Sequence, residues 1–554
     1  MTGVEAFLEI LHRAGVTHLF GNPGTTELPL NDALARDRRV RYVLGLHECP
    51  VIAAADGYAM AGGRLAVVNL HTNCGLGNAS GMLVNAKAAG SPLLVTAGQQ
   101  DTRHLFEEPV LAAPLVDMAR PLVKYAAEVA RVEDLPNATR RAIQAALTPP
   151  TGPVFLSLPL DVQTALADGL DLSAPWPVDR HVRPARGPLQ QAAQLLANAA
   201  NPVILAGSRV IESNGSRELV SLAETLGAPV LNEQNTSRGR FPIPTDHPLY
   251  AGPIPLWNPD IPAVLAGYDV AFVVGMNVLR LYIRQEPTRP LPPGLKLIHL
   301  DNDPAEIGKN YPVEVGLVGD PKAGLAELVY EIDRRLTPEM VRAAGERGCR
   351  HAERLAAARD AFRAAIDTKV AARPLSGAGL MGSLARVLPA DAAVVEECPT
   401  THGNVLERLG AVRDPAAYFA HRGWALGWGI GCALGVKLAW PDRPVLAVLG
   451  DGSMAFGMQG LWTAARERLP VVLVVANNRR YHILEVCGDR LALPDLRGGP
   501  GMTLDEPVID FVALARALGV DAHAVADADE LSDRVRAGLA GDRPVLLEVA
   551  VAGG

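Results

Sequence analysis

Short apolar runs alternate with stretches of helical periodicity along most of this chain. The clearest case lies between residues 444 and 481, where two β-branched runs, residues 445–449 and 471–475, are each bounded by turn residues. Such runs are typical of strands that are buried on both faces of a parallel sheet. Residues 454–468 between them carry apolar side chains at helical spacing. The pattern therefore predicts a β-α-β unit with a single helix.

The candidate chemistry of this unit lies just beyond its two strands, at Asp451 and Asn478. Both side chains are expected at one edge of the sheet, since open α/β sheets bind ligands where their parallel strands end. A carboxylate oxygen, an amide oxygen and a backbone carbonyl near Arg480 would together suit Mg²⁺, which takes hard oxygen ligands. Gly452 and Ser453 add unhindered N–H groups at a helix start, which favour a diphosphate.

The same alternation extends over three blocks of the chain. It predicts the α/β class, with three doubly wound, Rossmann-like domains at residues 1–163, 187–335 and 376–554. Residues 164–188 are rich in Pro, Asp and Ala and indicate a linker between the first two domains. Residues 338–372 are rich in Arg, Glu and Ala, which predicts a solvent-facing helix that leads into the third domain.

Three polar candidates lie at strand ends in the first domain. Thr25 follows the strand predicted at residues 18–20, where a hydroxyl that caps the next helix is the simpler interpretation. Glu48 lies between a strand and a small-residue helix. A carboxylate there usually contacts solvent or the helix N-terminus, whereas in a desolvated pocket it would donate and accept a proton. His71 heads a Gly-rich turn, and a core histidine is about equally compatible with that position.

The other two domains add fewer candidates. Gly207 and Ser208 follow a strand of the middle domain, but a dinucleotide site is not expected because the G-x-G-x-x-G pattern is missing. The candidate segment of this domain is residues 280–284, with Tyr282 between two arginines. In the third domain Thr400 follows a strand, where it could meet a diphosphate, and a Gly-broken loop at residues 420–427 precedes a Gly-rich helix.

Composition narrows the class of protein. The 554 residues are enough for about three domains, and 49% hydrophobic with 20% charged residues is typical of soluble globular chains. The net charge of −8 argues against a nucleic acid or an anionic membrane as partner. Six scattered cysteines without metal-site spacing predict reduced thiols in a cytoplasmic protein. No apolar run reaches membrane length, and a signal peptide is not expected.

The Gly-Asp-Gly at residues 450–452, followed by Asn-Asn at residues 477–478, resembles the metal–diphosphate motif of thiamine diphosphate enzymes. Other motifs follow the order of one superfamily: GNPG with ELP, ADGYA, NLH with GLGNA, VTAGQQ, RPLVK, GDGS, LWTAA and NN. Over essentially its full length the chain resembles thiamine diphosphate-dependent 2-oxoacid decarboxylases and acetolactate synthase-like enzymes, and benzoylformate decarboxylases most. The resemblance implies a pyrimidine-binding domain, a middle domain and a diphosphate-binding domain.

The resemblance also implies thiamine diphosphate and Mg²⁺ as cofactors, and a homodimer with shared active sites that usually assembles into a homotetramer. It implies decarboxylation of a small 2-oxo acid through ylid and enamine intermediates, with Glu48 bonded to the cofactor pyrimidine. Thr25, His71 and Tyr282 align with substrate-site residues, and Leu426 aligns with the side chain that bends the cofactor. The other positions implied at the cofactor and metal are Thr400, Trp424 (through its carbonyl), Gly450, Gly452, Ser453, Tyr481, Asp451, Asn478 and Arg480.

Three departures from benzoylformate decarboxylases leave the substrate open. Tyr282 stands where those enzymes have a second active-site histidine. Cys487 stands near an aromatic position of their substrate pocket, and Pro399 replaces a threonine beside the cofactor. The decarboxylation chemistry is compatible with these changes, but an aryl 2-oxo acid is not assured as the substrate.

Two other functions compete with a decarboxylase. A carboligase or 2-hydroxyacyl-CoA lyase would share the fold and cofactor, and Arg280 and Arg284 would then meet a larger acyl substrate. Against an acetolactate synthase proper, the middle domain has no clear flavin-binding pattern. A paralogue without catalytic activity is disfavoured, because Glu48, Asp451 and Asn478 are all retained.

Overall fold

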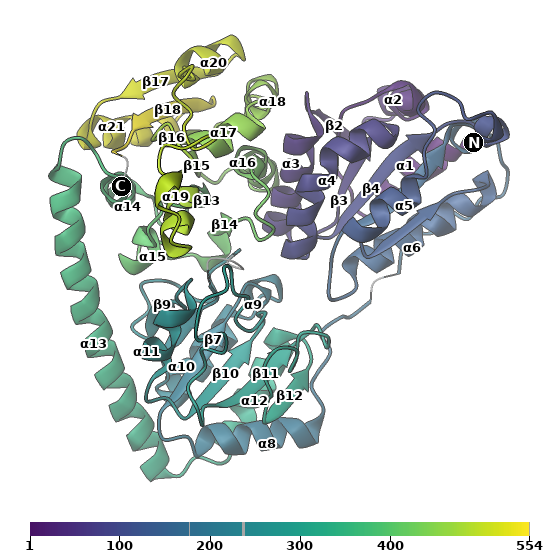
Figure 1. Ribbon diagram of the computed structural model, residues 1–554. Coiled ribbons are helices and arrows are strands. Elements are labelled where there is room, and N and C mark those ends of the chain that lie inside the picture. The colour runs from purple at the N-terminus through teal and green to yellow at the C-terminus, as the bar shows by residue number, and fades with distance from the viewer. Residues whose placement is uncertain (177, 235–238, 553–554) are drawn as a thin grey trace.

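The computed structural model describes residues 1–176, 178–234 and 239–552. Its strands form three six-stranded sheets, one in each of three units, and the paired strands run parallel (Figure 1). Helices lie between most of the successive strands along the chain. The α/β class and the three-unit, Rossmann-like architecture that the sequence predicts are confirmed.

The first unit has the strand order β2-β1-β3-β4-β6-β5. Its central strands are fully buried, as their β-branched apolar runs predict. The strands are β1 (His18–Gly21), β2 (Arg41–Leu44), β3 (Ala66–Leu70), β4 (Leu93–Gln99), β5 (Tyr125–Glu128) and β6 (Val154–Pro159). The α-helices are α1 (Gly3–Arg13), α2 (Leu28–Arg36), α3 (Glu48–Gly62), α4 (Thr72–Ala89), α5 (Leu115–Ala119), α6 (Leu135–Leu147) and α7 (Leu160–Thr164).

The middle unit has the order β12-β11-β10-β7-β8-β9, so its topological switch point lies between β7 and β10. The strands are β7 (Pro202–Ala206), β8 (Val230–Asn232), β9 (Tyr250–Pro253), β10 (Val270–Val274), β11 (Lys296–Asp301) and β12 (Val315–Val318). The α-helices are α8 (Arg186–Ala197), α9 (Arg209–Glu212), α10 (Ser216–Leu226), α11 (Ile261–Leu265) and α12 (Pro321–Asp333).

The C-terminal unit has the order β14-β13-β15-β16-β18-β17, and β15 and β16 are parallel neighbours that end at the same edge. The strands are β13 (Ala393–Glu397), β14 (Tyr418–Ala420), β15 (Val445–Gly450), β16 (Val472–Asn477), β17 (Asp521–Val525) and β18 (Val545–Ala550). The α-helices are α14 (Gly377–Val387), α15 (Val405–Arg408), α16 (Trp428–Ala439), α17 (Asp451–Gly457), α18 (Gly460–Glu467), α19 (His482–Arg490), α20 (Phe511–Ala517) and α21 (Ala528–Leu539).

Two connectors join the units. Residues 165–185 contain no helix or named strand wherever the structure describes them, in agreement with the predicted linker. The helix α13 (Pro338–Ala371) then runs along the outside of the molecule between the middle and C-terminal units (Figure 1). Only Ala344, Ile366 and Val370 of its described side chains are buried, as expected for a charged connector.

Four strands were not predicted from the sequence, namely β5, β9, β14 and β17. Each of them is the last strand at an edge of its sheet. Of these, β14 is apolar and buried but only three residues long. The others have a neighbour on one side only and are exposed on more of their surface, so they lack the continuous apolar run of a central strand. The burial pattern of β5, which includes no fully buried residue, illustrates this.

The prediction of a single helix at residues 454–468 is wrong, because the structure has two helices there, α17 and α18. Gly457 and Gly460 flank the break, and both lie against the start of α16. A Cβ atom on Gly457 would stand 2.6 Å from the carbonyl oxygen of Gly427. The close approach of α16 therefore bends the helical region at its glycines.

The first and C-terminal units are joined by the contact between α3 and α16, which pack side by side (Figure 1). Small residues line this contact. A Cβ atom on Gly57 would stand 2.4 Å from the carbonyl oxygen of Cys432, and one on Gly435 would stand 1.9 Å from that of Ala54. The two helices therefore approach to backbone contact, which only glycine permits at these positions.

No helix within the described residues combines the length and hydrophobicity that a membrane span requires.

All six cysteines are unpaired thiols.

We expect Gly435→Ala to destabilise the protein by about 1–3 kcal/mol, because the new methyl group would displace the backbone of α3. Thermal unfolding of the purified protein measures this as a fall in Tm. Gly345→Ala is the matched control. A Cβ atom on Gly345, in α13, would meet no described neighbour within 4 Å, so the Tm of this variant should stay level or rise slightly. An unchanged Tm for Gly435→Ala would contradict the backbone contact.

Candidate active site

The edge that the sequence predicts to bind a metal lies where β15 and β16 end. Oδ1 of Asp451 accepts a hydrogen bond from the N–H of Gly452 (2.9 Å), whereas its Oδ2 is buried without a hydrogen-bond partner among the described residues. Burial raises the pKa of Asp451, and the dipoles of nearby backbone N–H groups, that of Gly452 first, oppose the rise. Asn478 lies beside this carboxylate, and its Oδ1 accepts a bond from the N–H of Arg480 (3.0 Å).

Among the described residues, Oδ2 of Asp451 has no donor, and the amide oxygen of Asn478 belongs to the same strand-end edge. Within the described ranges there is no group of three His, Cys, Asp or Glu side chains that could hold a metal. A cation bound here would therefore need Asp451, amide and carbonyl oxygens from the protein, and further oxygens from a ligand or water.

The helix α17 starts directly after this edge, with Gly450 as its N-cap. Gly452 and Ser453 are buried in its first turn, where backbone N–H groups lack intrahelical partners. The ring of Tyr481 lies against Gly452, because a Cβ atom on Gly452 would stand 2.5 Å from Cε1 of the tyrosine. These residues surround the end of β15 with N–H donors, a hydroxyl and an aromatic wall.

Glu48 is the first residue of α3, and its side chain is buried. Its Oε2 accepts a hydrogen bond from Nδ2 of Asn78 (3.0 Å), and its Oε1 accepts one from Nδ2 of Asn22 (3.4 Å). Asn78 lies in α4 and Asn22 in the turn after β1. The Gly-rich segments of the first unit thus supply the amides that orient this carboxylate.

His71 precedes α4 and packs on the GNPG turn. Its ring fills the space beside Gly24, where a Cβ atom would stand 2.1 Å from Nδ1. Nδ1 also lies 2.8 Å from Oε2 of Glu27, a buried carboxylate that accepts hydrogen bonds from the N–H groups of Gly24 (3.0 Å) and Gly98 (2.8 Å). Glu27 therefore holds the imidazole by Nδ1, which leaves Nε2 as the nitrogen that can face a ligand. Thr25 is exposed in the same turn.

Trp424 and Leu426 lie in the loop between β14 and α16, and both are partly buried. Trp424 has a left-handed backbone (φ 64°), which is unusual for a bulky residue. The next residue, Ala425, exchanges two hydrogen bonds with the side chain of Asn85 in α4: its N–H donates to Oδ1 (3.1 Å) and its carbonyl accepts from Nδ2 (2.8 Å). The loop conformation is thus held from another unit.

Tyr282 lies in the middle unit and is 40% exposed. Its ring stacks on Trp424 of the C-terminal unit, with centroids 5.3 Å apart and planes 22° from parallel. The ring of Trp257 also lies near that of Tyr282, with centroids 6.2 Å apart. Partial burial raises the pKa of Tyr282, and the side chain of Cys487 contributes to the same shift. Tyr282 and Cys487 therefore share one aromatic wall with Trp424.

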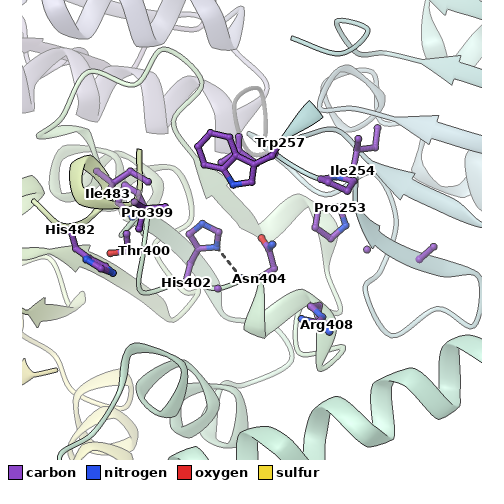
Figure 2. Close-up of a pocket in the computed structure, with 16 residues that line it drawn as sticks. Pro253, Ile254, Trp257, Pro399, Thr400, His402, Asn404, Arg408, His482 and Ile483 are labelled. Atoms are coloured by element: carbon purple, nitrogen blue, oxygen red, sulfur yellow. Dashed lines mark hydrogen bonds between the residues drawn. The ribbon is translucent and has the colours of Figure 1, made fainter. Parts of the chain in front are cut away.

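Thr400 borders a cavity of about 560 Å³ between the middle and C-terminal units. Trp257 comes from the middle unit, whereas His402, Asn404 and His482 come from the C-terminal unit (Figure 2). Nδ1 of His402 accepts a hydrogen bond from the N–H of Asn404 (3.0 Å). Among the described residues, the cavity lining includes histidines and Arg408 but no carboxylate, which suits an anionic ligand.

The predicted site residues form separate groups within one chain. Glu48, His71 and Thr25 gather at the strand ends of the first unit, Asp451 and Asn478 lie where β15 and β16 end, and Tyr282 stacks on Trp424. Ala425 is bonded to Asn85, which lies fourteen residues along α4 from His71, or about 20 Å at 1.5 Å per residue. Among the described residues, Tyr282 makes no hydrogen bond or ring contact with His71.

Two buried carboxyl groups hold α16 from both sides. Glu397 accepts hydrogen bonds from the N–H groups of Gly427, Trp428 and Gly429 (2.7–3.2 Å), and burial raises its pKa to about 8 against those bonds. Asp56 of α3 accepts a hydrogen bond from Nε1 of Trp428 (2.7 Å) and another from the Ser91 hydroxyl. Burial raises the pKa of Asp56 to about 6.

Several residues that matter here were not predicted from the sequence. The asparagines around Glu48 lie within the GNPG and GLGNA motifs, and their recurrence beside glycine could have indicated a role at the site. For Glu27 the indication was weaker, namely an acidic residue inside a turn at a strand end. Asn85 and Glu397 had none, since their partners lie thirty or more positions away at Ala425 and Gly427.

Comparison with protein families finds three matching models that cover most of the chain. They describe the thiamine pyrophosphate enzyme N-terminal binding domain at residues 1–110, the central domain at residues 189–328 and the C-terminal binding domain at residues 400–549.

Individual relatives match over the whole chain. Benzoylformate decarboxylase of Pseudomonas aeruginosa is 37% identical, with 98% of each chain covered. The acetolactate synthase large subunit of Corynebacterium glutamicum is 29% identical, over 100% of this chain and 87% of its own. Among solved structures, benzoylformate decarboxylase of Polynucleobacter necessarius superimposes with a TM-score of 0.88 at 30% identity, covering 100% of this chain and 99% of its own. A 4-hydroxybenzoylformate decarboxylase of Rhodococcus jostii gives 0.87 at 32%, with both chains fully covered.

The raised pKa of Asp56 predicts a pH-dependent stability. In the folded protein Asp56 keeps its proton up to about pH 6, whereas the unfolded chain loses it near its usual pKa of 3.8. The contribution of Asp56 to the free energy of unfolding therefore falls as the pH rises from about 4 to about 6, and it is constant above that. The loss between pH 5 and pH 7 is of the order of 1 kcal/mol.

Asp56→Asn carries no such proton, so its Tm should fall less than that of the wild type between pH 5 and pH 7. Thermal unfolding at the two pH values measures the difference. Asp533→Asn, at an exposed position, is the control and should keep the wild-type pH dependence. An identical pH dependence for Asp56→Asn and the wild type would contradict the assignment.

Proposed function

The chain belongs to the thiamine pyrophosphate enzyme family, and from this premise we propose that it decarboxylates a small 2-oxo acid with thiamine diphosphate and Mg²⁺. The observation that carries the proposal is the buried Asp451 carboxylate, whose Oδ2 has no partner among the described residues and which lies beside Asn478 at the end of two parallel strands. The proposed domain limits, residues 1–163, 187–335 and 376–554, each enclose the strands of one sheet.

The residues at this edge fit a metal-bound diphosphate. We assign Asp451, Asn478 and the carbonyl of Arg480 to Mg²⁺, because they offer hard oxygens and the buried carboxylate needs a counter-charge. Diphosphate oxygens would complete the coordination. The residues proposed to receive the diphosphate and the rings are Thr400, Trp424, Leu426, Gly450, Gly452, Ser453 and Tyr481.

When bound, thiamine diphosphate supplies a nucleophilic ring carbon and a sink for the electron pair that CO₂ leaves behind. In our proposal Glu48 exchanges a proton with the pyrimidine ring, a role that suits a buried carboxyl group oriented by Asn22 and Asn78. His71, held through Nδ1 by Glu27, and the hydroxyl of Thr25 face the substrate. Their N–H and O–H groups would orient its carboxylate and carbonyl.

We further propose that two copies of the chain share each active site, and that the enzyme is a homodimer or a homotetramer. His71 and Tyr282 of one chain lie apart, because the segment beside Tyr282 contacts α4 at Gly81 and Asn85, about 15 to 20 Å along the helix from His71. Apolar side chains on the first unit support a second copy: Phe106 is 95% exposed and Val110 is 83% exposed.

The middle unit favours a decarboxylase over a flavin-dependent synthase. At its switch point a Cβ atom on Gly207 would stand 2.4 Å from the side chain of Met276. Arg209 spans the same edge, donating to Asp301 (2.7 Å) and to Asn277 (2.7 Å). Side chains thus fill the crevice in which an open α/β sheet binds a dinucleotide. A carboligase or acyl-CoA lyase without flavin is the alternative, which rests on the similarity to acetolactate synthase.

The test is a panel of 2-oxo acids, supplied with thiamine diphosphate and Mg²⁺ and with or without acceptor aldehydes. We expect CO₂ release that stops on chelation of the metal. Glu48→Gln should bind the cofactor but lose turnover by roughly 10²–10⁴-fold, since glutamine cannot exchange a proton with the ring. Cofactor binding is followed by calorimetry. No CO₂ release from any acid, or wild-type turnover in Glu48→Gln, would overturn the proposal.

Tyr282 is expected to influence which product leaves. Protonation of the carbon that has lost CO₂ gives an aldehyde, whereas attack of that carbon on a second carbonyl gives a ligated product. A phenol whose pKa is raised stays protonated at neutral pH and donates hydrogen bonds, but it shuttles protons poorly compared with an imidazole. We therefore expect a larger share of ligation than in an enzyme with histidine at this position.

The measurement is the ratio of ligated product to aldehyde at a fixed acceptor concentration. Tyr282→His should lower this ratio by roughly tenfold or more, and Tyr282→Phe should slow both routes. Cys487→Ser, a change in the same wall, serves as the control for altered packing. Equal ratios in the Tyr, His and Phe enzymes would mean that Tyr282 is only a wall of the pocket.

A further inference from the structure

A buried arginine precedes the loop segment that carries Trp424 and Leu426. The side chain of Arg422 is only 3% exposed, although it belongs to the C-terminal unit and its partners belong to the middle unit. One guanidinium nitrogen lies 3.4 Å from Oε1 of Glu212, at the end of α9, and another lies 3.6 Å from Oε2 of Glu233, just after β8. The ion pairs thus join two units at the base of this loop.

The carboxylate of Glu233 is held by Ser208 of its own unit, independently of Arg422. Its Oε1 accepts hydrogen bonds from the N–H and the hydroxyl of Ser208, at 2.9 Å and 2.5 Å. Its Oε2 is fully buried and has no hydrogen-bond partner among the described residues, so the guanidinium at 3.6 Å supplies a counter-charge. Removal of that charge would leave this buried oxygen with the more distant attraction of Arg209 in place of a close cation, which is unfavourable.

The stem of Arg422 is also packed. A Cβ atom on Gly239 of the middle unit would stand 2.7 Å from Cδ of Arg422, so only glycine leaves room for the arginine. The carbonyl of the same glycine accepts a hydrogen bond from the N–H of Ala420 (2.9 Å). The middle unit therefore contacts the loop at two positions, through backbone at Ala420 and through charge at Arg422.

Residues 425–427 of the loop are held by the first unit and by the C-terminal unit itself. Asn85 of the first unit bonds both backbone groups of Ala425, and the N–H of Gly427 donates to Glu397 (2.9 Å). Residues 420–427 are thus fixed at four points. Trp424 and Leu426 lie between those points, and they are the residues to which the proposed function assigns the cofactor.

We propose that Arg422 is a positioning residue: its ion pairs with Glu212 and Glu233 hold residues 420–427 in the conformation that receives thiamine diphosphate. This inference rests on the proposed function. A loop that is ordered in advance loses little conformational entropy on binding, whereas a loosened loop must be ordered at the expense of affinity. Arg422 therefore acts on cofactor affinity and not on the chemical step.

The experiment compares Arg422→Met and Arg422→Lys with the wild-type full-length protein. The Kd for thiamine diphosphate at saturating Mg²⁺ is measured by calorimetry, and hydrogen exchange of residues 420–427 is measured without cofactor. We expect Arg422→Met to raise Kd at least tenfold and to speed exchange in this segment. Arg422→Lys should fall between Arg422→Met and the wild type, because it retains charge but not the planar fork. At saturating cofactor, kcat should stay within about twofold of wild type.

Arg413→Met is the matched control. Arg413 also faces the middle unit, 3.9 Å from Asp246, but this pair is exposed and lies outside residues 420–427. Its removal should change neither Kd nor exchange, since exposed pairs contribute little. If Arg422→Met does not fold, Glu212→Gln replaces it, because Glu212 is partly exposed and its loss leaves Arg422 paired with Glu233. Glu212→Gln should raise Kd by a smaller factor.

Wild-type Kd and wild-type exchange in Arg422→Met, or in Glu212→Gln where that variant replaces it, would overturn the inference. So would a fall in kcat at saturating cofactor with Kd unchanged, which would move Arg422 to the chemical step. Failure of the proposed function has a different signature, because the wild-type protein itself would then not bind thiamine diphosphate.

Discussion

The structure depends first on the backbone contact between α3 and α16. Gly57 and Gly435 let the two helices approach until carbonyl oxygens of one lie where side chains of the other would be. The same contact brings the helix starts to one end, since the thiol of Cys49 lies 3.8 Å from the carbonyl of Gly427. Glu48 begins one of these helices, and the loop with Leu426 leads into the other. The orientation of both candidate half-sites follows from this packing.

That packing also explains why one chain has two clusters of polar residues instead of one pocket. The first unit presents Glu48 and His71 at its strand ends, each held by neighbours from its own Gly-rich turns. The C-terminal unit presents Asp451 at the edge of β15 and β16, where a buried oxygen lacks a partner among the described residues. Parallel sheets collect polar groups at their carboxyl edges, so two sheets produce two such collections. In the proposed dimer, a second copy would bring complementary edges together.

The middle unit has a different part in this arrangement. At its own switch point Gly207 lies against Met276, and Arg209 donates to Asp301. The unit contributes Tyr282 to the aromatic wall and contacts the loop before α16 through Arg422 and its carboxylate partners. A Rossmann-like sheet without visible catalytic groups thus positions residues that belong to another sheet.

The amino-acid order alone predicted the three parallel sheets and the strand-end positions of Glu48, Asp451 and Asn478. This was possible because a strand buried on both faces requires a continuous apolar run, and the residue after such a run must lie at the sheet edge. The edge strands, the division of α17 from α18, the pairing of His71 with Glu27 and the anchoring of Arg422 were decided by the tertiary structure. The edge strands β5, β9 and β17 lack the apolar run, and β14 is only three residues long. The side-chain contacts join residues 44 to 210 positions apart, a distance over which no local pattern carries information.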